Sequence, residues 1–115
     1  MASNWYSVVI DANDIAVLSR WWAQVLGYSI VFESETEVAI AKDEDTNPGI
    51  VFVPVPEGKT VKNRLHIDLN PDDQAAEVDR LIDLGARRAD VGQGESRWVV
   101  LADPEGNEFC VLTAR

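Results

Sequence analysis

Apolar and polar positions change from a strand-like to a helix-like pattern twice along this chain. The first strand-like run, Tyr6 to Ile10, precedes apolar residues at the 3.6-residue spacing of a helix, namely Ile15, Leu18, Trp22 and Val25. Asp11, Asn13 and Asp14 all have the side-chain oxygen that an N-cap needs, and Gly27 is expected to end the helix. Ser29 to Glu33, Glu37 to Lys42 and Ile50 to Val55 then read as three more strands.

After an aperiodic linker, Pro56 to Asn63, the pattern starts again. Arg64 to Leu69 alternates, which predicts a strand with a buried face and a polar face. The expected buried residues are Leu65, Ile67 and Leu69, and the polar ones are Arg64, His66 and Asp68. Asn70 is expected to cap a second helix that has Pro71 at its first position and ends at Gly85.

The rest of the second half predicts three short strands, near Arg87 to Asp90, from Ser96 to Ala102, and up to Thr113. A loop at Val91 to Glu95 and a tight turn at Asp103 to Asn107 separate them. The helix starts of the two halves are 59 positions apart (73 − 14), and the closing glycines 58 (85 − 27). Two copies of a βαβββ unit explain this repeat.

The amino-acid composition limits the kinds of partner that this protein is expected to bind. The 115 residues suit one domain, and a net charge of −10, from 10 basic and 20 acidic residues, repels phosphate backbones and anionic membranes. We therefore expect no nucleic-acid or membrane partner. The single Cys110 excludes an intramolecular disulfide, and the first residues lack the basic start and apolar run of a signal peptide. A soluble, cytoplasmic protein is the expectation.

Five segments together match a known pattern: Ser7 to Asp11, Trp21 to Gly27, Asn63 to Leu69, Leu84 to Arg87 and Ala102 to Leu112. They resemble the vicinal oxygen chelate superfamily, which holds glyoxalase I, extradiol dioxygenases, fosfomycin resistance enzymes and bleomycin resistance proteins. The resemblance implies an α+β fold in one domain, 1–115, with modules at about 5–55 and 64–113 and a linker at about 56–63. In that fold the modules form a strongly curved mixed sheet with the helices outside, and members commonly form homodimers.

Metal-dependent members of the superfamily take ligands from the first and fourth strands of each module. By position, the resemblance places these sites at Ser7, at His66 and at Cys110, where the family usually has Glu, and within Ile50 to Val55. That last segment has no side chain able to bind a metal, and Ser7 is a poor neutral ligand. We therefore expect no metal cofactor, with His66 and Cys110 as the sole ligand candidates.

His66, the only histidine, is expected to make a polar contact with a ligand, or to bind a metal. Asp68 lies two residues on, and either orients the imidazole or is a solvated carboxylate. Arg64 would pair with an anionic ligand or with a nearby acid. Cys110 is flanked by apolar residues and is expected to be an inert thiol.

Four tryptophans are many for this length, and flat rings suit planar ligands. Trp22 lies on the apolar stripe of the first helix, whereas Trp21 is one position off it and is predicted at a subunit interface or under a loop. The aromatic residues expected to line a ligand pocket are Trp98 and Trp5, followed by Phe52 and Tyr28.

Two functions of different class remain open. The first is a binding protein of the glyoxalase/bleomycin resistance type that sequesters an organic, aromatic or cationic molecule without a metal. Its ligand-binding residues would be His66, Trp98, Trp5, Phe52, Ser7, Cys110, Arg64 and Asp68. The second is a glyoxalase-like lyase, isomerase or dioxygenase, in which a metal or acid–base chemistry is centred on His66.

Overall fold

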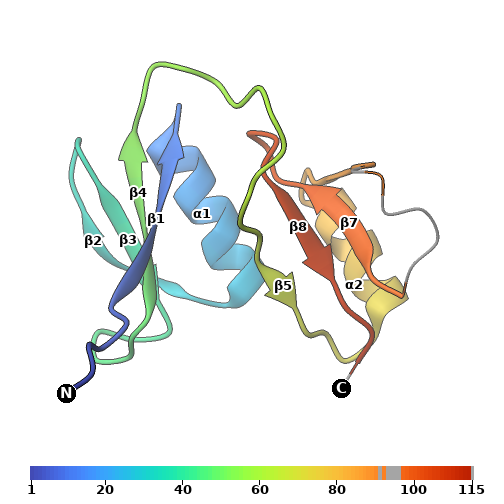
Figure 1. The fold of residues 1–115 in the computed structure, drawn as a ribbon, viewed down its shortest axis with the longest axis horizontal. Coiled ribbons are helices and arrows are strands. Elements are labelled where there is room, and N and C mark those ends of the chain that lie inside the picture. Colours follow the sequence, from blue (N-terminus) through green and yellow to red (C-terminus); the bar gives the residue numbers. More distant parts are fainter. Residues whose placement is uncertain (91, 93–96, 115) are drawn as a thin grey trace. The chain divides into compact units, whose positions relative to one another are not determined.

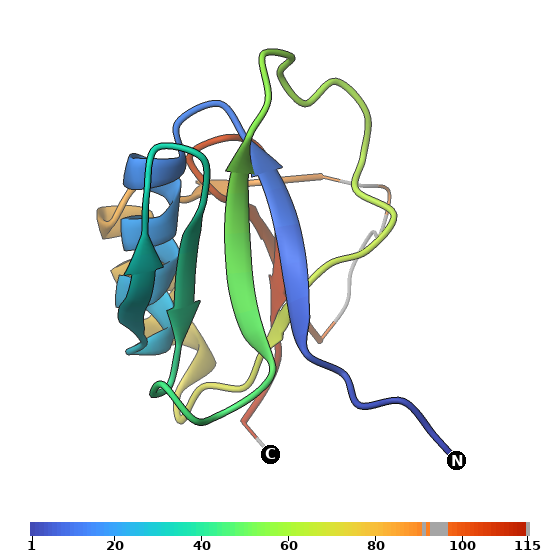
Figure 2. The ribbon, with the colours of Figure 1, turned by 90° about the vertical axis from the view of Figure 1, so that its left-hand side faces the viewer.

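The computed structural model describes residues 1–90, 92 and 97–114, which form two compact units, Met1–Gly58 and Lys59–Arg115. Unit 1 contains β1 (Ser7–Ala12), α1 (Ile15–Leu26), β2 (Ser29–Glu33), β3 (Val38–Ala41) and β4 (Gly49–Pro54). Its strands form one mixed sheet in the order β1-β4-β3-β2, with β1 parallel to β4 and the other pairs antiparallel. Figure 2 shows β1 and β4 side by side, followed by the β2–β3 hairpin.

Unit 2 repeats this topology with shorter elements (Figure 1). These are β5 (Asp68–Leu69), α2 (Gln74–Asp83), β6 (Arg87–Arg88), β7 (Val99–Ala102) and β8 (Glu108–Val111). The sheet order is β5-β8-β7-β6, again with a parallel pair, β5 and β8, at one edge. The structure therefore confirms the α+β class and the two βαβββ modules.

The repeat extends to the pairing of individual residues. In unit 1, Val9 of β1 lies opposite Val51 of β4, and in unit 2, Asp68 of β5 lies opposite Cys110 of β8. Asp68 lies 59 positions after Val9 (68 − 9), and Cys110 lies 59 positions after Val51 (110 − 51), which is the offset between the helix starts in the sequence. The fourth-strand position that matches Cys110 is thus Val51.

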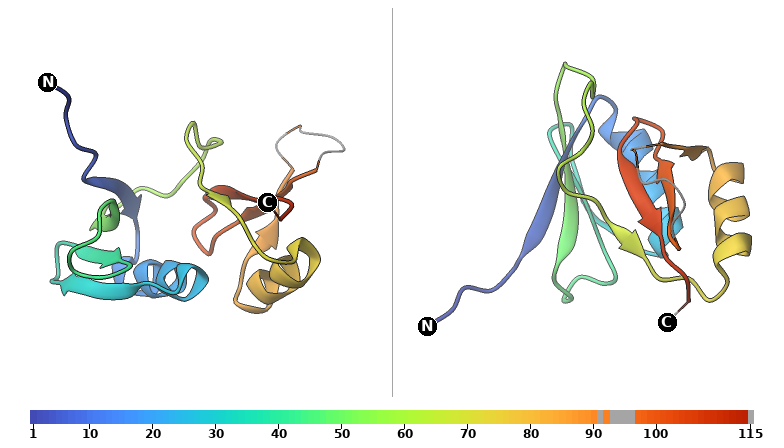
Figure 3. Two further views of the ribbon diagram at one scale, coloured as in Figure 1. Left: turned by 90° about the horizontal axis from the view of Figure 1, so that it is seen from below. Right: turned by 45° about the vertical axis from the view of Figure 1, so that its right-hand side comes forward.

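In each unit the core lies between the helix and one face of the sheet. Leu18 and Trp22 of α1 are fully or almost fully buried, as are Ile40 of β3 and Phe52 of β4. Figure 3 shows α1 beside one face of its sheet and α2 beside β7 and β8. In unit 2 the residues buried between α2 and the sheet include Val78, Leu81, Leu101, Phe109 and Val111.

Trp21 is buried within unit 1. Its ring meets that of Trp22 edge to face, with the ring centroids 5.1 Å apart. The prediction of Trp21 at a subunit interface is therefore wrong. A helix in contact with three strands buries a wider stripe than the narrow one read from the sequence.

The start of unit 2 differs from the prediction. Asp73, not Asn70, caps α2, because its carboxylate accepts the Ala76 N–H at 3.1 Å. Asp14 caps α1 in the same way, by accepting the Val17 N–H. The predicted strand from Arg64 is reduced to β5, and Leu65, predicted to be buried, is 86% exposed.

Two connections follow the predicted chemistry. Gly27 closes α1 at φ 67°, a left-handed conformation that suits glycine. In the turn between β7 and β8, the buried Asp103 accepts the N–H groups of Glu105 and Asn107, both at 2.9 Å. The predicted loop 91–95 lies outside the described residues except for Gly92, and the predicted strand 96–102 begins at Val99 in the structure. Within the described ranges, no helix has the length and apolar character needed to cross a bilayer.

Candidate functional site

A histidine, a carboxylate and a thiol meet on unit 2. One possible ligand atom each from His66, Asp68 and Cys110 lies within 4.8 Å of the other two. His66 Nδ1 is 2.9 Å from Asp68 Oδ1, and both side chains are nearly half exposed, whereas Cys110 is 7% exposed. Of the polar residues selected from the sequence, these three are the ones that the fold brings together.

The parallel pairing of β5 with β8 creates this cluster. Cys110 N–H donates to the Ile67 carbonyl, and Leu112 N–H to the Leu69 carbonyl, both at 2.9 Å. These bonds place Asp68 opposite Cys110, and cross-strand neighbours share a face of a sheet. That face is opposite to the one carrying the buried Phe109 and Val111, so we call it the helix-free face of unit 2.

The segment before His66 is held against β8 by Glu108. Lys59 Nζ donates to Glu108 Oε2 and Asn63 N–H donates to Glu108 Oε1, each at 2.9 Å. Burial acts to raise the pKa of Glu108, but the hydrogen bonds from Asn63 and Lys59 outweigh it, and the pKa is lowered. Part of the predicted linker, Lys59 to Asn63, therefore belongs to unit 2 and leads directly into the cluster.

The environment keeps the Cys110 thiol protonated. Burial raises its pKa, and the charge of Asp68 and a hydrogen bond to the Asp68 carboxylate raise it further, against a smaller opposite effect of Lys62. A thiol is nucleophilic as its thiolate, so Cys110 lacks the features of a catalytic cysteine. This agrees with the inert thiol expected from the sequence.

The matching row of unit 1 is apolar. Val51 alternates along β4 with the buried Ile50 and Phe52, so its side chain lies on the face turned away from α1, the helix-free face of unit 1. The register then sets one row across all four strands of this face. The row consists of Phe32, Ala39, Val51 and Val9, of which Phe32 and Val9 are 51% and 56% exposed.

Phe32 is a candidate that sequence reasoning missed. The register of β2 shifts between Ile30 and Phe32, which places Phe32 opposite Ala39 and turns Glu33 toward Arg20 of α1. Strict alternation along Ser29 to Glu33 puts Phe32 and Ile30 on one face, so the sequence pattern does not identify it.

The aromatic residues selected from the sequence differ in how far they are exposed. Phe52, expected at a ligand pocket, is completely buried on the α1 side of its sheet and belongs to the core of unit 1. Trp5 and Trp98 are 67% and 43% exposed, and Tyr28 is partly buried. Ser7 is partly buried on the same face as Val9, and Arg64 is exposed. Phe52 is therefore removed from the candidates for a ligand pocket, while Trp5 and Trp98 stay exposed candidates.

Comparison with known proteins now identifies the family. The model of the glyoxalase-like domain matches residues 7–112, which is nearly the whole chain. The chain belongs to the glyoxalase-like domain family. No curated protein matches it by sequence.

Solved structures agree with this fold. A glyoxalase/bleomycin resistance protein/dioxygenase family enzyme from Burkholderia phytofirmans is 22% identical with a TM-score of 0.71, over 95% of this chain and 97% of that one. A fosfomycin resistance protein from Mesorhizobium loti is 15% identical with a TM-score of 0.72, over 100% and 94%. A bleomycin resistance determinant encoded on transposon Tn5 is 15% identical with a TM-score of 0.63, over 98% and 99%.

This glyoxalase-like domain does not fit a magnesium or manganese site with ligands from both modules, which is the kind of site that the resemblance implies. Magnesium and manganese prefer several oxygen ligands, but the unit 2 cluster offers one carboxylate, one imidazole and one protonated thiol. In unit 1, Ser7 matches His66 and offers a neutral hydroxyl, while Val51, which matches Cys110, has no donor atom. Zinc takes imidazole, carboxylate and thiolate ligands, so these three residues would hold a zinc ion with the Cys110 proton released on binding.

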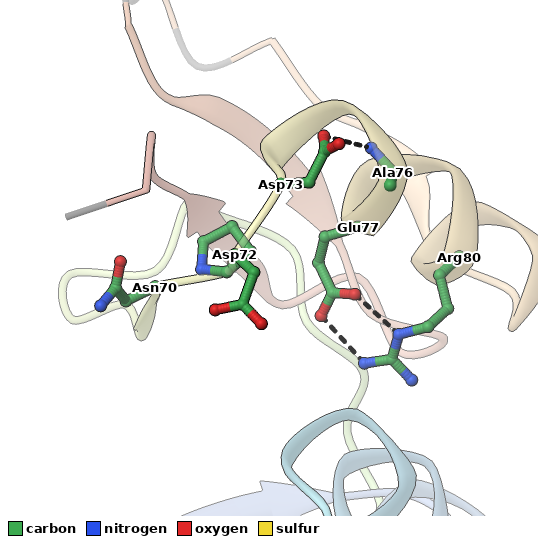
Figure 4. Close-up of a pocket in the computed structure, with 7 residues that line it drawn as sticks. Asn70, Asp72, Asp73, Ala76, Glu77 and Arg80 are labelled. Carbon is green, nitrogen blue, oxygen red and sulfur yellow. Dashed lines mark hydrogen bonds and ion pairs between the residues drawn. The ribbon is translucent and has the colours of Figure 1, made fainter.

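Figure 4 shows a second feature of the glyoxalase-like domain, an acidic hollow of about 420 Å³ beside the start of α2. Two of its three carboxylates, those of Asp73 and Glu77, already have partners, and the third is that of the exposed Asp72. Asp73 caps the helix, and Glu77 forms two hydrogen bonds to Arg80, at 2.7 and 2.9 Å. The hollow therefore reflects the capping and ion pairing of α2.

Proposed function

We propose that this chain is a small-molecule binding protein that holds an organic, aromatic or cationic ligand without a metal. The observation that carries the proposal is the contrast between the helix-free faces. Unit 1 presents the apolar row of Phe32, Ala39, Val51 and Val9, and unit 2 presents His66 and Asp68. Taken separately, the apolar row and the polar pair are each a kind of surface that sites for organic molecules use.

The ligand face of unit 1 is tested with Phe32→Ala. Purified protein is screened against planar and cationic compounds by the shift in melting temperature and by tryptophan fluorescence, because a ligand that prefers the folded state must stabilise it. Removing a half-exposed ring that contacts the ligand is expected to raise the Kd about tenfold with little change in stability.

Val17→Ala is the matched control. Val17 is 57% exposed on α1, away from the apolar row, and its truncation should leave the Kd unchanged. Equal effects of the two substitutions, or no stabilising compound in the screen, would contradict the proposal.

One observation supports a second candidate function, which is acid–base catalysis by a lyase or isomerase at His66. An imidazole 2.9 Å from a carboxylate is a common general base. Elemental analysis of protein purified without chelator, with calorimetric titration of zinc and manganese, separates the metal-dependent version. The binding proposal predicts no stoichiometric metal, whereas metal that disappears in His66→Ala would favour the enzyme.

The homodimer and the cytoplasmic location stay predictions. Light scattering coupled to size-exclusion chromatography tests the homodimer, which should have twice the 12.7 kDa mass of one chain.

A further inference from the structure

The contact between His66 and Asp68 determines which ring nitrogen holds the proton. Nδ1 is 2.9 Å from Asp68 Oδ1, and an ionised carboxylate only accepts hydrogen bonds. Nδ1 must then carry the hydrogen. In a neutral imidazole the other nitrogen, Nε2, is consequently a bare acceptor.

Asp68 is itself held in place for this role. Its backbone pairs with Cys110 across the parallel strands, and its carboxylate also receives a hydrogen bond from the Cys110 thiol. Because that thiol stays protonated, it acts as a donor and leaves the carboxylate as the acceptor between Cys110 and His66.

Nε2 is available to a ligand. The His66 side chain is 43% exposed, and among the described residues none forms a hydrogen bond with Nε2. An exposed acceptor with a fixed orientation selects ligands that offer a hydrogen, because a ligand acceptor or methyl group facing Nε2 would leave the ring nitrogen without a hydrogen-bond donor.

We infer that Asp68 is a positioning residue that holds His66 with its proton on Nδ1, so that Nε2 accepts a hydrogen bond from an N–H or O–H group of the ligand. The inference rests on the proposed function and narrows its ligand class to planar organic molecules with such a donor. A fully methylated or quaternary ligand of the same shape is expected to bind poorly.

Nitrogen-15 NMR of the imidazole tests the proton position without any ligand. His66 is the only histidine, so all imidazole signals belong to this residue and only its two ring nitrogens have to be distinguished. The spectra are recorded at increasing alkaline pH until the ring signals stop changing, so that the neutral ring is the form observed. Wild type is expected to show the proton on Nδ1, and Asp68→Ala should move it toward Nε2.

Two variants keep this experiment interpretable. Asp68→Asn removes the charge but preserves the side-chain shape, and it should weaken the Nδ1–H preference. Asp79→Ala makes the same charge change as Asp68→Ala at an exposed position on α2 and should leave the ring signals as in wild type. A proton on Nε2 in the wild-type protein would overturn the inference.

The ligand class is tested with benzimidazole and 1-methylbenzimidazole, which differ by the replacement of N–H with N–CH₃. With EDTA present to remove metal, wild type and Asp79→Ala are expected to bind benzimidazole about tenfold more tightly, the effect of one hydrogen bond. In His66→Ala the preference should vanish. Equal binding of the two probes to wild type would overturn the donor requirement.

The two experiments separate this inference from the proposed function. If neither probe binds, the proposed binding activity and the ligand class fail together, while Nδ1–H in the NMR spectrum still supports the positioning role of Asp68. If both probes bind equally, the binding activity stands and the donor requirement fails.

Discussion

Neighbouring side chains in unit 2 have different chemistry because their surroundings differ. Cys110 and Asp68 lie opposite each other on one face of the sheet, but the thiol is buried and the carboxylate is nearly half exposed. Burial and the neighbouring Asp68 raise the pKa of Cys110 and so favour its neutral thiol, whereas the Asp68 carboxylate is open to solvent and lies 2.9 Å from His66 Nδ1. The result is a donor, an acceptor and an oriented imidazole.

Cys110 is expected to react slowly with thiol reagents such as DTNB at pH 8. Its pKa is raised and it is 7% exposed, so the folded protein presents little thiolate. The rate should rise at least about a hundredfold in guanidinium chloride, which exposes the thiol. Fast, stoichiometric labelling of the folded protein would show that the site is open and the thiolate stabilised.

The same shift makes stability depend on pH. A folded-state pKa above the unfolded value, about 8.5 for cysteine, means that the thiol contributes stability below that pH, and the contribution is lost as the pH rises through the folded pKa. Urea denaturation at about pH 7 and pH 10 should therefore show a smaller loss for Cys110→Ala than for wild type. Equal losses would contradict the raised pKa.

At the level of elements, short strands are held by contacts outside the ladder. β5 has two residues, and the irregular segment before it is fastened to β8 through Glu108, Lys59 and Asn63. The side chains of Lys59 and Glu108 are 19% and 15% exposed, so this ion pair is less screened than a surface pair. It supports the segment that carries His66.

Glu108→Gln is expected to lower the free energy of unfolding by about 1–2 kcal/mol at pH 7, because it weakens two charge-assisted hydrogen bonds. The folded pKa of Glu108 is lowered, so its contribution is present above the unfolded pKa and is lost as pH falls through the folded value. Urea denaturation should show the difference between wild type and variant shrinking below about pH 4.

Glu77→Gln is the control for that experiment. Glu77 also has a lowered pKa, caused first by its hydrogen bond with Arg80, but the pair spans three residues of one helix and is more exposed. Such pairs contribute about 0.3–0.5 kcal/mol. A larger cost for Glu77→Gln than for Glu108→Gln would contradict the anchoring role of Glu108.

At the scale of the whole molecule, the two units share one topology but present different side chains on their helix-free faces. The chain as a whole has a strong negative charge. The row through Val9 and Val51 is apolar in unit 1, whereas the matching positions in unit 2 are Asp68 and Cys110, although the pairing is the same. The net charge of −10 affects both units, because like charges repel one another in a compact chain.

Added salt is therefore expected to stabilise the protein. The melting temperature should rise by a few degrees between about 0.02 and 0.5 M sodium chloride, as screening reduces this repulsion. Asp72→Lys with Asp79→Lys, two exposed positions, changes the charge from −10 to −6 and should flatten the dependence. A melting temperature that falls with salt would indicate that attractive ion pairs dominate instead.

The sequence by itself determined the two βαβββ modules. Their periodicity, the repeat of 59 positions and the glycine after α1 are local signals, and local backbone preferences suffice to produce them. The lack of metal-binding side chains from Ile50 to Val55 was equally readable, because no folding of that segment adds a donor atom.

The tertiary structure decided which side chains meet. Phe52 and Phe32 are both apolar residues in strands, and only the register and the position of α1 make one core and the other surface. Alternation alone also predicted a buried Leu65, but β5 begins only at Asp68, so Leu65 lies outside the paired strand and is exposed. Asp68 remained ambiguous until β5 was paired with β8, because contact between distant strands depends on register, and register is a property of the assembled sheet.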